Sequence, residues 1–302
     1  MDLAHFTNYR KHITQTITDT GQWVGLCDEN GWPITDLPPA VNLTAPETHL
    51  TAESIELTVP VSPGDKLMAE LADVELGQMD ASGQMDVSTG PARVIVVARE
   101  GEMRRAYRVV SAKLTGQTAP TQMTISGVDY LAQLAWWPAP SVPATWIGPF
   151  KSWDTDASGT TYNTPRQVTQ VRFATTADGH TMSGPAAPTI AKVCAVSAAQ
   201  VHHLMGWDTT SMAVINPANQ AGDELLIRIT DDPLLDTISG PALSAGISVR
   251  VGLWWPGDPA PQVIELTNAD PTTGEMTFTT RTATWAAPVL LITVEQITEQ
   301  PV

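Results

Sequence analysis

Charged side chains are scarce in this chain of 302 residues, because Asp, Glu, Lys and Arg together make up only 16% of it. Acidic residues outnumber basic ones by 32 to 16, which gives a formal net charge of −16. Such a chain repels nucleic acid and anionic lipid unless its few basic residues cluster. The hydrophobic share of 42% is ordinary for a folded protein, so the composition argues against wholesale disorder.

Cysteine is nearly absent: only Cys27 and Cys194 occur, in different halves of the chain and beside apolar neighbours. Two cysteines exclude a secreted disulfide scaffold and favour buried free thiols. The N-terminal stretch lacks the apolar run of a signal peptide. The longest apolar stretches, such as "AAPVLLITV", are too short to span a bilayer. We therefore expect synthesis in a cytoplasm and no membrane segment.

The common catalytic signatures are also missing: there is no G-x-S-x-G, H-E-x-x-H, G-x-G-x-x-G, phosphate-binding loop or paired-cysteine zinc motif. The stretch "DTDASGTTYNTP" begins like a calcium loop at Asp154, but Pro165 stands where a bidentate glutamate is needed. This pattern favours a solvated Asx turn. His202 and His203 point about 100° apart on a helix, so a surface or interface role is favoured over metal binding. We expect no enzyme activity, no metal and no cofactor.

Threonine, proline and glycine fill much of the remaining sequence, which favours strands and turns over long helices. Alternating apolar residues predict a hairpin over 22–37, a strand over 54–61 with Ile55, Leu57 and Val59 on one face, a second hairpin over 92–114 and a strand over 121–129. Further strands are predicted over 223–230, 247–255, 262–268, 275–285 and 288–297. The predicted fold class is therefore mainly β (α+β), with a few short helices.

The order of these elements predicts three parts. Residues 1–140 form a first β module, which ends in a short helix that Asp129 caps and Pro138 stops. Residues 141–188 are a Pro/Gly-rich linker or insertion with one strand expected over 168–176. Residues 189–302 form a helix over 189–206, which Gly206 ends, followed by a second β module.

Tryptophan is unusually frequent, with ten residues against four Phe and four Tyr. Two Trp-Trp-Pro segments stand out, at Trp136, Trp137 and Pro138 and at Trp254, Trp255 and Pro256. Each segment follows the end of a predicted element, which favours packing in the core or at a subunit interface. In the strand 247–255, alternation puts Trp255 on the core face and Trp254 on the other face. A platform for stacking on sugar rings stays open as the alternative.

Basic residues cluster in one segment, 93–113, as Arg93, Arg99, Arg104, Arg105, Arg108 and Lys113. The simplest interpretation is that this segment pairs with acidic residues of its own fold or of a neighbouring subunit. The candidate interface residues are therefore Arg104, Arg105 and Arg108, together with the four tryptophans of the Trp-Trp-Pro segments.

Two stretches, "GPARVIVVAREGEMRRAYRVVSAKL…TQMTISGVDYLAQLAWWP" and "ISGPALSAGISVRVGLWWPGDPAP", resemble minor tail proteins of long-tailed phages that infect actinobacteria, in particular the hub-like group at the tail tip or baseplate. The resemblance covers roughly residues 20–140 and 225–302. It implies two β-barrel-like modules that repeat a tail-tube fold, no active site, and a trimeric ring around the tail axis. Such hubs close the channel, anchor tape-measure and fibre proteins, and open for genome passage.

The resemblance predicts a structural component of the virion tail tip that joins the tail tube to tip and fibre proteins and gates genome delivery. Its expected partners are further copies of itself in a homotrimer, or alternatively a hexamer, and other tail proteins such as the distal tail protein. Strong acidity suits a channel through which phage DNA passes without specific binding. Two alternatives stay open: a carbohydrate-binding β protein that recognises the host envelope, and an adaptor ring of the distal-tail type.

Overall fold

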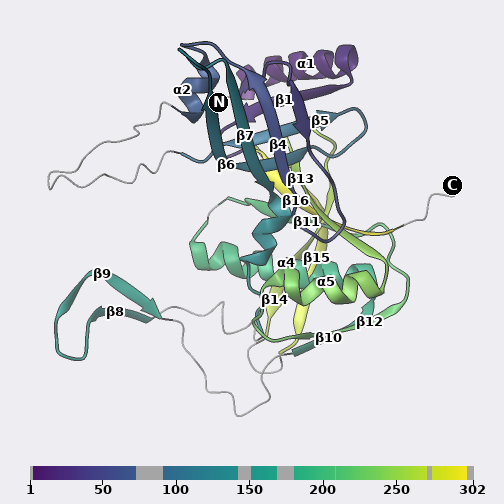
Figure 1. The fold of residues 1–302 in the computed structure, drawn as a ribbon. Coiled ribbons are helices and arrows are strands. Elements are labelled where there is room, and N and C mark those ends of the chain that lie inside the picture. The colour runs from purple at the N-terminus through teal and green to yellow at the C-terminus, as the bar shows by residue number, and fades with distance from the viewer. Residues whose placement is uncertain are drawn as a thin grey trace. The chain divides into compact units, whose positions relative to one another are not determined.

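A computed structural model describes residues 3–72, 91–141, 151–168, 180–207, 209–270 and 274–297. Strands make up 42% and helices 24% of it, so the predicted mainly β class with a few helices is confirmed. Among these residues, no helix combines the length and the apolar character that crossing a membrane requires. The chain divides into two compact units (Figure 1).

The first unit comprises Met1–Gln133, Val249–Pro261 and Ala283–Ile292. Its elements from the N-terminal part of the chain are α1 (Leu3–Thr20), β1 (Gln22–Cys27), β2 (Pro33–Asp36), β3 (Asn42–Thr44), β4 (Ser54–Pro60), α2 (Lys66–Leu71), β5 (Val94–Arg99), β6 (Arg105–Thr115), β7 (Gln122–Asp129) and the beginning of a 3-10 helix, η1 (Tyr130–Ala135). The strands form one antiparallel sheet in the order β2-β1-β5-β6-β7-β4-β3.

Strand β5 is buried on both faces of this sheet. Ile95 and Val97 join an apolar cluster with residues of β1, β4 and β7, whereas Val94, Val96 and Ala98 face a second cluster. The second cluster contains Phe6 and Ile13 of α1, as well as Trp23, Leu253 and Trp255. Helix α1 packs on β1 (Figure 1). Burial on both sides explains why "VIVVA" is a continuous apolar run instead of an alternating one.

Several predicted elements of this unit are confirmed. The hairpin over 22–37 pairs β1 with β2, and the hairpin over 92–114 pairs β5 with β6. Ile55, Leu57 and Val59 are all fully buried on β4, as their alternation predicts. Asp129 caps the helix η1, because its carboxylate accepts a hydrogen bond from the Leu131 N–H at 3.1 Å.

The second unit comprises Leu134–Ser248, Gln262–Thr282 and Thr293–Val302. Its elements are the end of η1, β8 (Lys151–Thr155), β9 (Thr161–Val168), β10 (His180–Pro185), α4 (Ala186–Met205), β11 (Met212–Ile215), β12 (Glu224–Ile229), α5 (Leu234–Ser244), β14 (Gln262–Ala269) and β15 (Met276–Thr282). The unit boundaries fall inside β13 (Ile247–Trp254) and β16 (Val289–Gln296), so each unit holds part of both strands.

A five-stranded sheet has the order β13-β16-β11-β14-β15, and two smaller sheets pair β10 with β12 and β8 with β9. Helix α4 packs on β11, β14 and α5. Most of its apolar residues up to Val201 are buried, and Gly206 ends it in a left-handed conformation with φ 62°, as the sequence predicts. Asp270 and Gly274 close the hairpin between β14 and β15, because the Gly274 N–H donates to the Asp270 carbonyl at 2.9 Å.

The compact units are discontinuous in sequence, whereas the prediction divides the chain at residues 140 and 188. Residues 249–261 join the first unit because Leu253 and Trp255 pack in its second apolar cluster. Within 141–188 the described residues form β8, β9, β10 and the start of α4. The strand predicted over 168–176 lies, apart from its first residue, outside the described residues.

Candidate functional site

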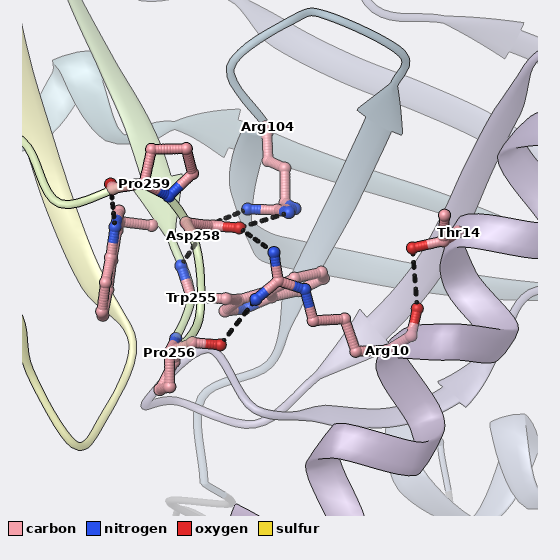
Figure 2. Close-up of polar contacts among 8 residues, drawn as sticks. Arg10, Thr14, Arg104, Trp255, Pro256, Asp258 and Pro259 are labelled. Carbon is pink, nitrogen blue, oxygen red and sulfur yellow. Dashed lines mark hydrogen bonds and ion pairs between the residues drawn. The ribbon is translucent and has the colours of Figure 1, made fainter.

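The second Trp-Trp-Pro segment forms a tight turn in the first unit (Figure 2). The Asp258 N–H donates to the Trp255 carbonyl at 2.9 Å, which closes a β-turn over residues 255–258. Pro256 occupies the second position and Gly257 the third, where the backbone φ is +91°. A positive φ at the third position is typical of a type II turn, and glycine adopts it without strain.

Three residues donate to the Asp258 carboxylate. One oxygen accepts from Arg10 Nη2 at 2.6 Å and from Arg104 Nη2 at 3.0 Å, and the other accepts from the Trp255 N–H at 2.7 Å and from Arg104 Nη1. Arg10 also donates to the Pro256 carbonyl at 2.8 Å. We call Arg10, Arg104 and Asp258 the arginine clamp. It ties α1 and the residue that precedes β6 to the turn, as Figure 2 shows.

The two tryptophans of this segment are both buried, with 0% exposure for Trp255 and 5% for Trp254. The Arg104 guanidinium lies 4.3 Å from the Trp255 ring, and the indole N–H of Trp255 donates to the Gly31 carbonyl at 2.9 Å. Trp254 donates to the Pro259 carbonyl at 3.1 Å and meets Trp285 edge to face. Neither indole ring therefore offers a free face to a sugar.

The predicted pairing of the basic segment with acidic residues of its own fold is confirmed for several arginines. Arg104 binds Asp258, and Arg105 lies 3.2 Å from Glu47 and 3.6 Å from Glu102. Arg93 binds Glu70 through two nitrogens, at 2.7 and 3.0 Å. Arg108 is exposed on β6, so of the three arginine candidates it is the most accessible.

The first Trp-Trp-Pro segment lies in the second unit and is only half buried. Trp136 is 80% exposed, whereas Trp137 is 5% exposed and meets the His202 ring edge to face at 6.1 Å. The Leu234 N–H donates to the Trp137 carbonyl at 2.7 Å, and Pro138 forms a β-bridge with Pro233. Ser141 donates to Asp231 through both its N–H and its hydroxyl, at 2.6 and 2.7 Å.

The calcium-like stretch forms the Asx turn that its sequence favours. Asp156 accepts hydrogen bonds from the Ser158 hydroxyl and N–H and from the Thr160 N–H. These bonds lower the pKa of Asp156, with the Ser158 hydroxyl as the main cause. In the part of the chain that the structure describes, no group of three His, Cys, Asp or Glu residues is placed to hold a metal ion.

The histidine pair lies in the last turn of α4, where His202 is half-buried and His203 is exposed. His202 contacts the Ser211 hydroxyl at 3.0 Å and also meets the Trp207 ring. Burial lowers the pKa of His202. Its neutral form is therefore favoured in the folded protein.

One polar cluster has no counterpart in the sequence predictions. The Asp36 carboxylate accepts hydrogen bonds from the Tyr9 hydroxyl at 2.6 Å and the Trp23 indole at 2.8 Å, and it contacts His12 Nε2. Burial opposes the charge of Asp36, but the hydrogen bonds outweigh burial and lower its pKa. The spacing of Tyr9, His12 and Asp36 carries no recognisable motif, because the packing of α1 against β2 brings them together.

In the arginine clamp two guanidinium groups share the single Asp258 carboxylate, so the clamp ties α1 to the turn. No protein-family model matches the chain, and no curated protein matches it.

Proposed function

We propose that this protein is a structural subunit of a phage tail tip, which assembles with further copies of itself and with other tail proteins. The main support is the exposed indole of Trp136, on a chain that buries most of its other aromatic candidates. A large exposed apolar side chain is typical of a protein–protein contact, where tryptophan is enriched.

Further large apolar side chains of the second unit are also exposed. Leu226 and Leu243 are each 71% exposed, and Met205 at the end of α4 is 60% exposed. Exposed apolar surface of this kind favours association with another protein over a monomeric state. The low content of charged residues, 16%, agrees with extensive protein contacts.

The proposed assembly is a ring at the tail tip that joins the tail tube to tip and fibre proteins and gates genome delivery. The formal charge of −16 supports a channel that does not hold DNA, because phosphates find few cationic partners there. Arg104 and Arg105 are engaged in ion pairs of their own fold, which leaves Arg108 as the basic candidate for a partner.

Native mass spectrometry of the purified protein over a range of concentrations tests this proposal. We expect a trimer for a hub, and a hexamer identifies the distal-tail type of adaptor instead. A protein that stays monomeric at every concentration, and that is missing from purified tails by peptide mass spectrometry, contradicts the proposal.

Of the four tryptophans in the two Trp-Trp-Pro segments, Trp136 is the one that offers an exposed ring to a sugar, because Trp137, Trp254 and Trp255 are buried. Neither segment therefore presents a platform of two adjacent exposed rings. A glycan array probed with the wild-type protein and with Trp136→Ala distinguishes the two roles. Loss of glycan binding with an unchanged oligomer supports the alternative.

A further inference from the structure

The sheet of the first unit curls so that its two edge strands come near each other. Strands β2 and β3 stand at opposite ends of the strand order, yet only residues 37–41 separate them in sequence. The Leu37 N–H donates to the Val24 carbonyl of β1 at 3.0 Å, and the Val41 N–H donates to the Thr58 carbonyl of β4 at 2.8 Å. A five-residue connection spans at most about 18 Å, so it bridges the gap between the two edges. We call this gap the seam.

The connection does not close the seam by strand pairing. Pro38 and Pro39 have no N–H groups, so they cannot donate to a neighbouring strand. A cavity of about 390 Å³ lies here, and its walls come from α1, β1, β2, β3, β4 and the connection. Its lining residues are Thr16, Thr20, Gln22, Trp23, Val24, Asp36, Leu37, Pro38, Pro39, Ala40, Leu43 and Leu57.

The size and the walls of this cavity fit a small organic molecule. Known ligand pockets measure about 300–1,000 Å³, and a dry cavity of about 150 Å³ already binds benzene. Val24, Leu37 and Leu43 continue into the apolar cluster that contains Leu57, so the inner wall is apolar. The hydroxyls of Thr16 and Thr20 already donate to backbone carbonyls of the helix and of Gln22.

Among the described residues of this lining, Asp36 is the only one that carries a charge at neutral pH. Its side chain is 40% exposed, and Tyr9, Trp23 and His12 hold it by one contact each. A carboxylate has about four acceptor positions, so one position stays open to a further donor. The lowered pKa keeps the carboxylate ionised.

We propose that the seam cavity binds a small organic cation, in which an ammonium group is joined to an apolar or aromatic body. The body contacts Leu37, Leu43 and Leu57, and the ammonium donates to the Asp36 carboxylate. An anion of the same shape is rejected, because its charge meets that carboxylate in a chain of net charge −16. This site is independent of the proposed role in a tail tip.

Two probes of matched shape and opposite charge test the proposal: 2-phenylethylammonium and 3-phenylpropanoate. Isothermal titration calorimetry at about pH 8 measures the affinity of each probe. We expect saturable binding of the ammonium probe, at least about tenfold tighter than that of the carboxylate probe. Equal binding of the two probes, or no binding of either, overturns the proposal.

Variants locate the binding. Leu43→Trp fills the cavity from the edge strand β3 and should abolish binding of the ammonium probe. Val110→Trp is the control, because Val110 is an exposed residue of β6 outside the cavity lining. Asp36→Asn should remove the preference for the cation, and thermal melting checks that this variant folds. Where Asp36→Asn does not fold, Leu43→Trp decides: undiminished binding to it overturns the proposal.

Discussion

The two Trp-Trp-Pro segments share three residues in a row and nothing of their structure. Trp255 and Pro256 begin a type II turn, because Gly257 and Asp258 follow and supply the positive φ and the carboxylate. In the first segment Ala139 and Pro140 follow, so this segment has neither a glycine for the positive φ nor a carboxylate to accept the hydrogen bonds. That segment instead pairs with residues 231–234 through main-chain hydrogen bonds.

The burial of the rings differs in the same way. Both indoles of the second segment are buried, whereas Trp136 of the first is 80% exposed beside a buried Trp137. The turn folds back on itself, so one ring enters the cluster around Phe6 and Trp23 and the other meets Trp285. Trp136 and Trp137 follow the 3-10 helix η1 in a turn and a bend, and Trp137 packs on His202 while Trp136 faces outward. Partners from elsewhere in the fold therefore decide whether each tryptophan is buried.

The sharpest test of this contrast is removal of the buried ring. We expect Trp255→Ala to lower the free energy of unfolding by about 4 kcal/mol, because the indole is fully buried and loses its contacts with Arg104 and Gly31. Urea unfolding followed by circular dichroism measures the change. A loss below about 1 kcal/mol contradicts the assignment of this ring to the core.

The arginine clamp should be the next most sensitive feature. Asp258→Asn keeps the side-chain shape but removes the charge that holds Arg10 and Arg104, which are 27% and 20% exposed. We expect the free energy of unfolding to fall by about 3 kcal/mol. This value lies at the lower end of the range for breaking a buried ion pair, because these arginines keep some contact with water. The matched control is Asp231→Asn beside the first segment, where neutral Ser141 is the donor. Its expected loss is below about 1 kcal/mol, and equal losses for the two variants contradict a special role for the clamp.

The turn itself can be tested at Gly257. An added Cβ atom there would lie 2.4 Å from Arg10 Nη1, and the alanine would have to adopt a φ of +91°. Gly257→Ala should therefore cost about 2 kcal/mol, of which about half reflects the backbone conformation. Gly101→Ala is the control in the same unit, since φ is +72° there and no atom lies within 4 Å of the added Cβ. Equal losses for the two variants in thermal unfolding show that Arg10 contributes nothing to the turn.

Much of the sheet is predictable from local sequence. Local sequence patterns predict three features of the sheet: the alternation in β4, the Asn30–Gly31 hairpin and the apolar run in β5. Each of them involves pairing between neighbouring strands. Helix α1 is missed because its sequence is rich in threonine, and its buried face rests on widely spaced residues such as Phe6 and Ile13. That spacing of seven is a helical signal, but a weak one without flanking apolar residues.

The sites are less predictable than the strands. The sequence shows that arginines cluster over 93–113, but not that Arg104 meets Asp258, which lies 154 positions away. Alternation puts Trp255 in the core, yet it leaves Trp254 on the opposite face, where Trp285 covers it. Asp36 and the seam depend on the curl of the whole sheet. Such features follow from tertiary packing, which a local pattern does not encode.

A smaller difference between the two segments concerns pH. Burial lowers the pKa of His202, which packs on Trp137, whereas Trp255 packs on the Arg104 guanidinium. As pH falls below about 6.5, the unfolded chain binds a proton first, so the stability that neutral His202 provides is lost. We expect the stability difference between wild type and His202→Gln to shrink from pH 8 to pH 5, as measured by urea unfolding at each pH. The pKa of His180 is also lowered by burial, but His180 is present in both proteins, so a difference that stays constant with pH contradicts the assignment to His202.

Substitution of Trp136 should have the smallest effect on stability. The variant therefore distinguishes a role in packing within the subunit from a role in assembly. Because this ring is 80% exposed, Trp136→Ala should change the free energy of unfolding by less than about 0.5 kcal/mol. If Trp136 lies in an interface, the same variant should make the free energy of association less favourable by roughly 2 kcal/mol or more. Native mass spectrometry would then detect dissociation of the oligomer at a protein concentration about 30-fold higher than for the wild type. Trp153→Ala is the matched control, since Trp153 is a tryptophan of β8 with 47% exposure. An oligomer that Trp136→Ala leaves intact, or that both variants weaken equally, removes Trp136 from the interface and leaves its exposure unexplained by assembly.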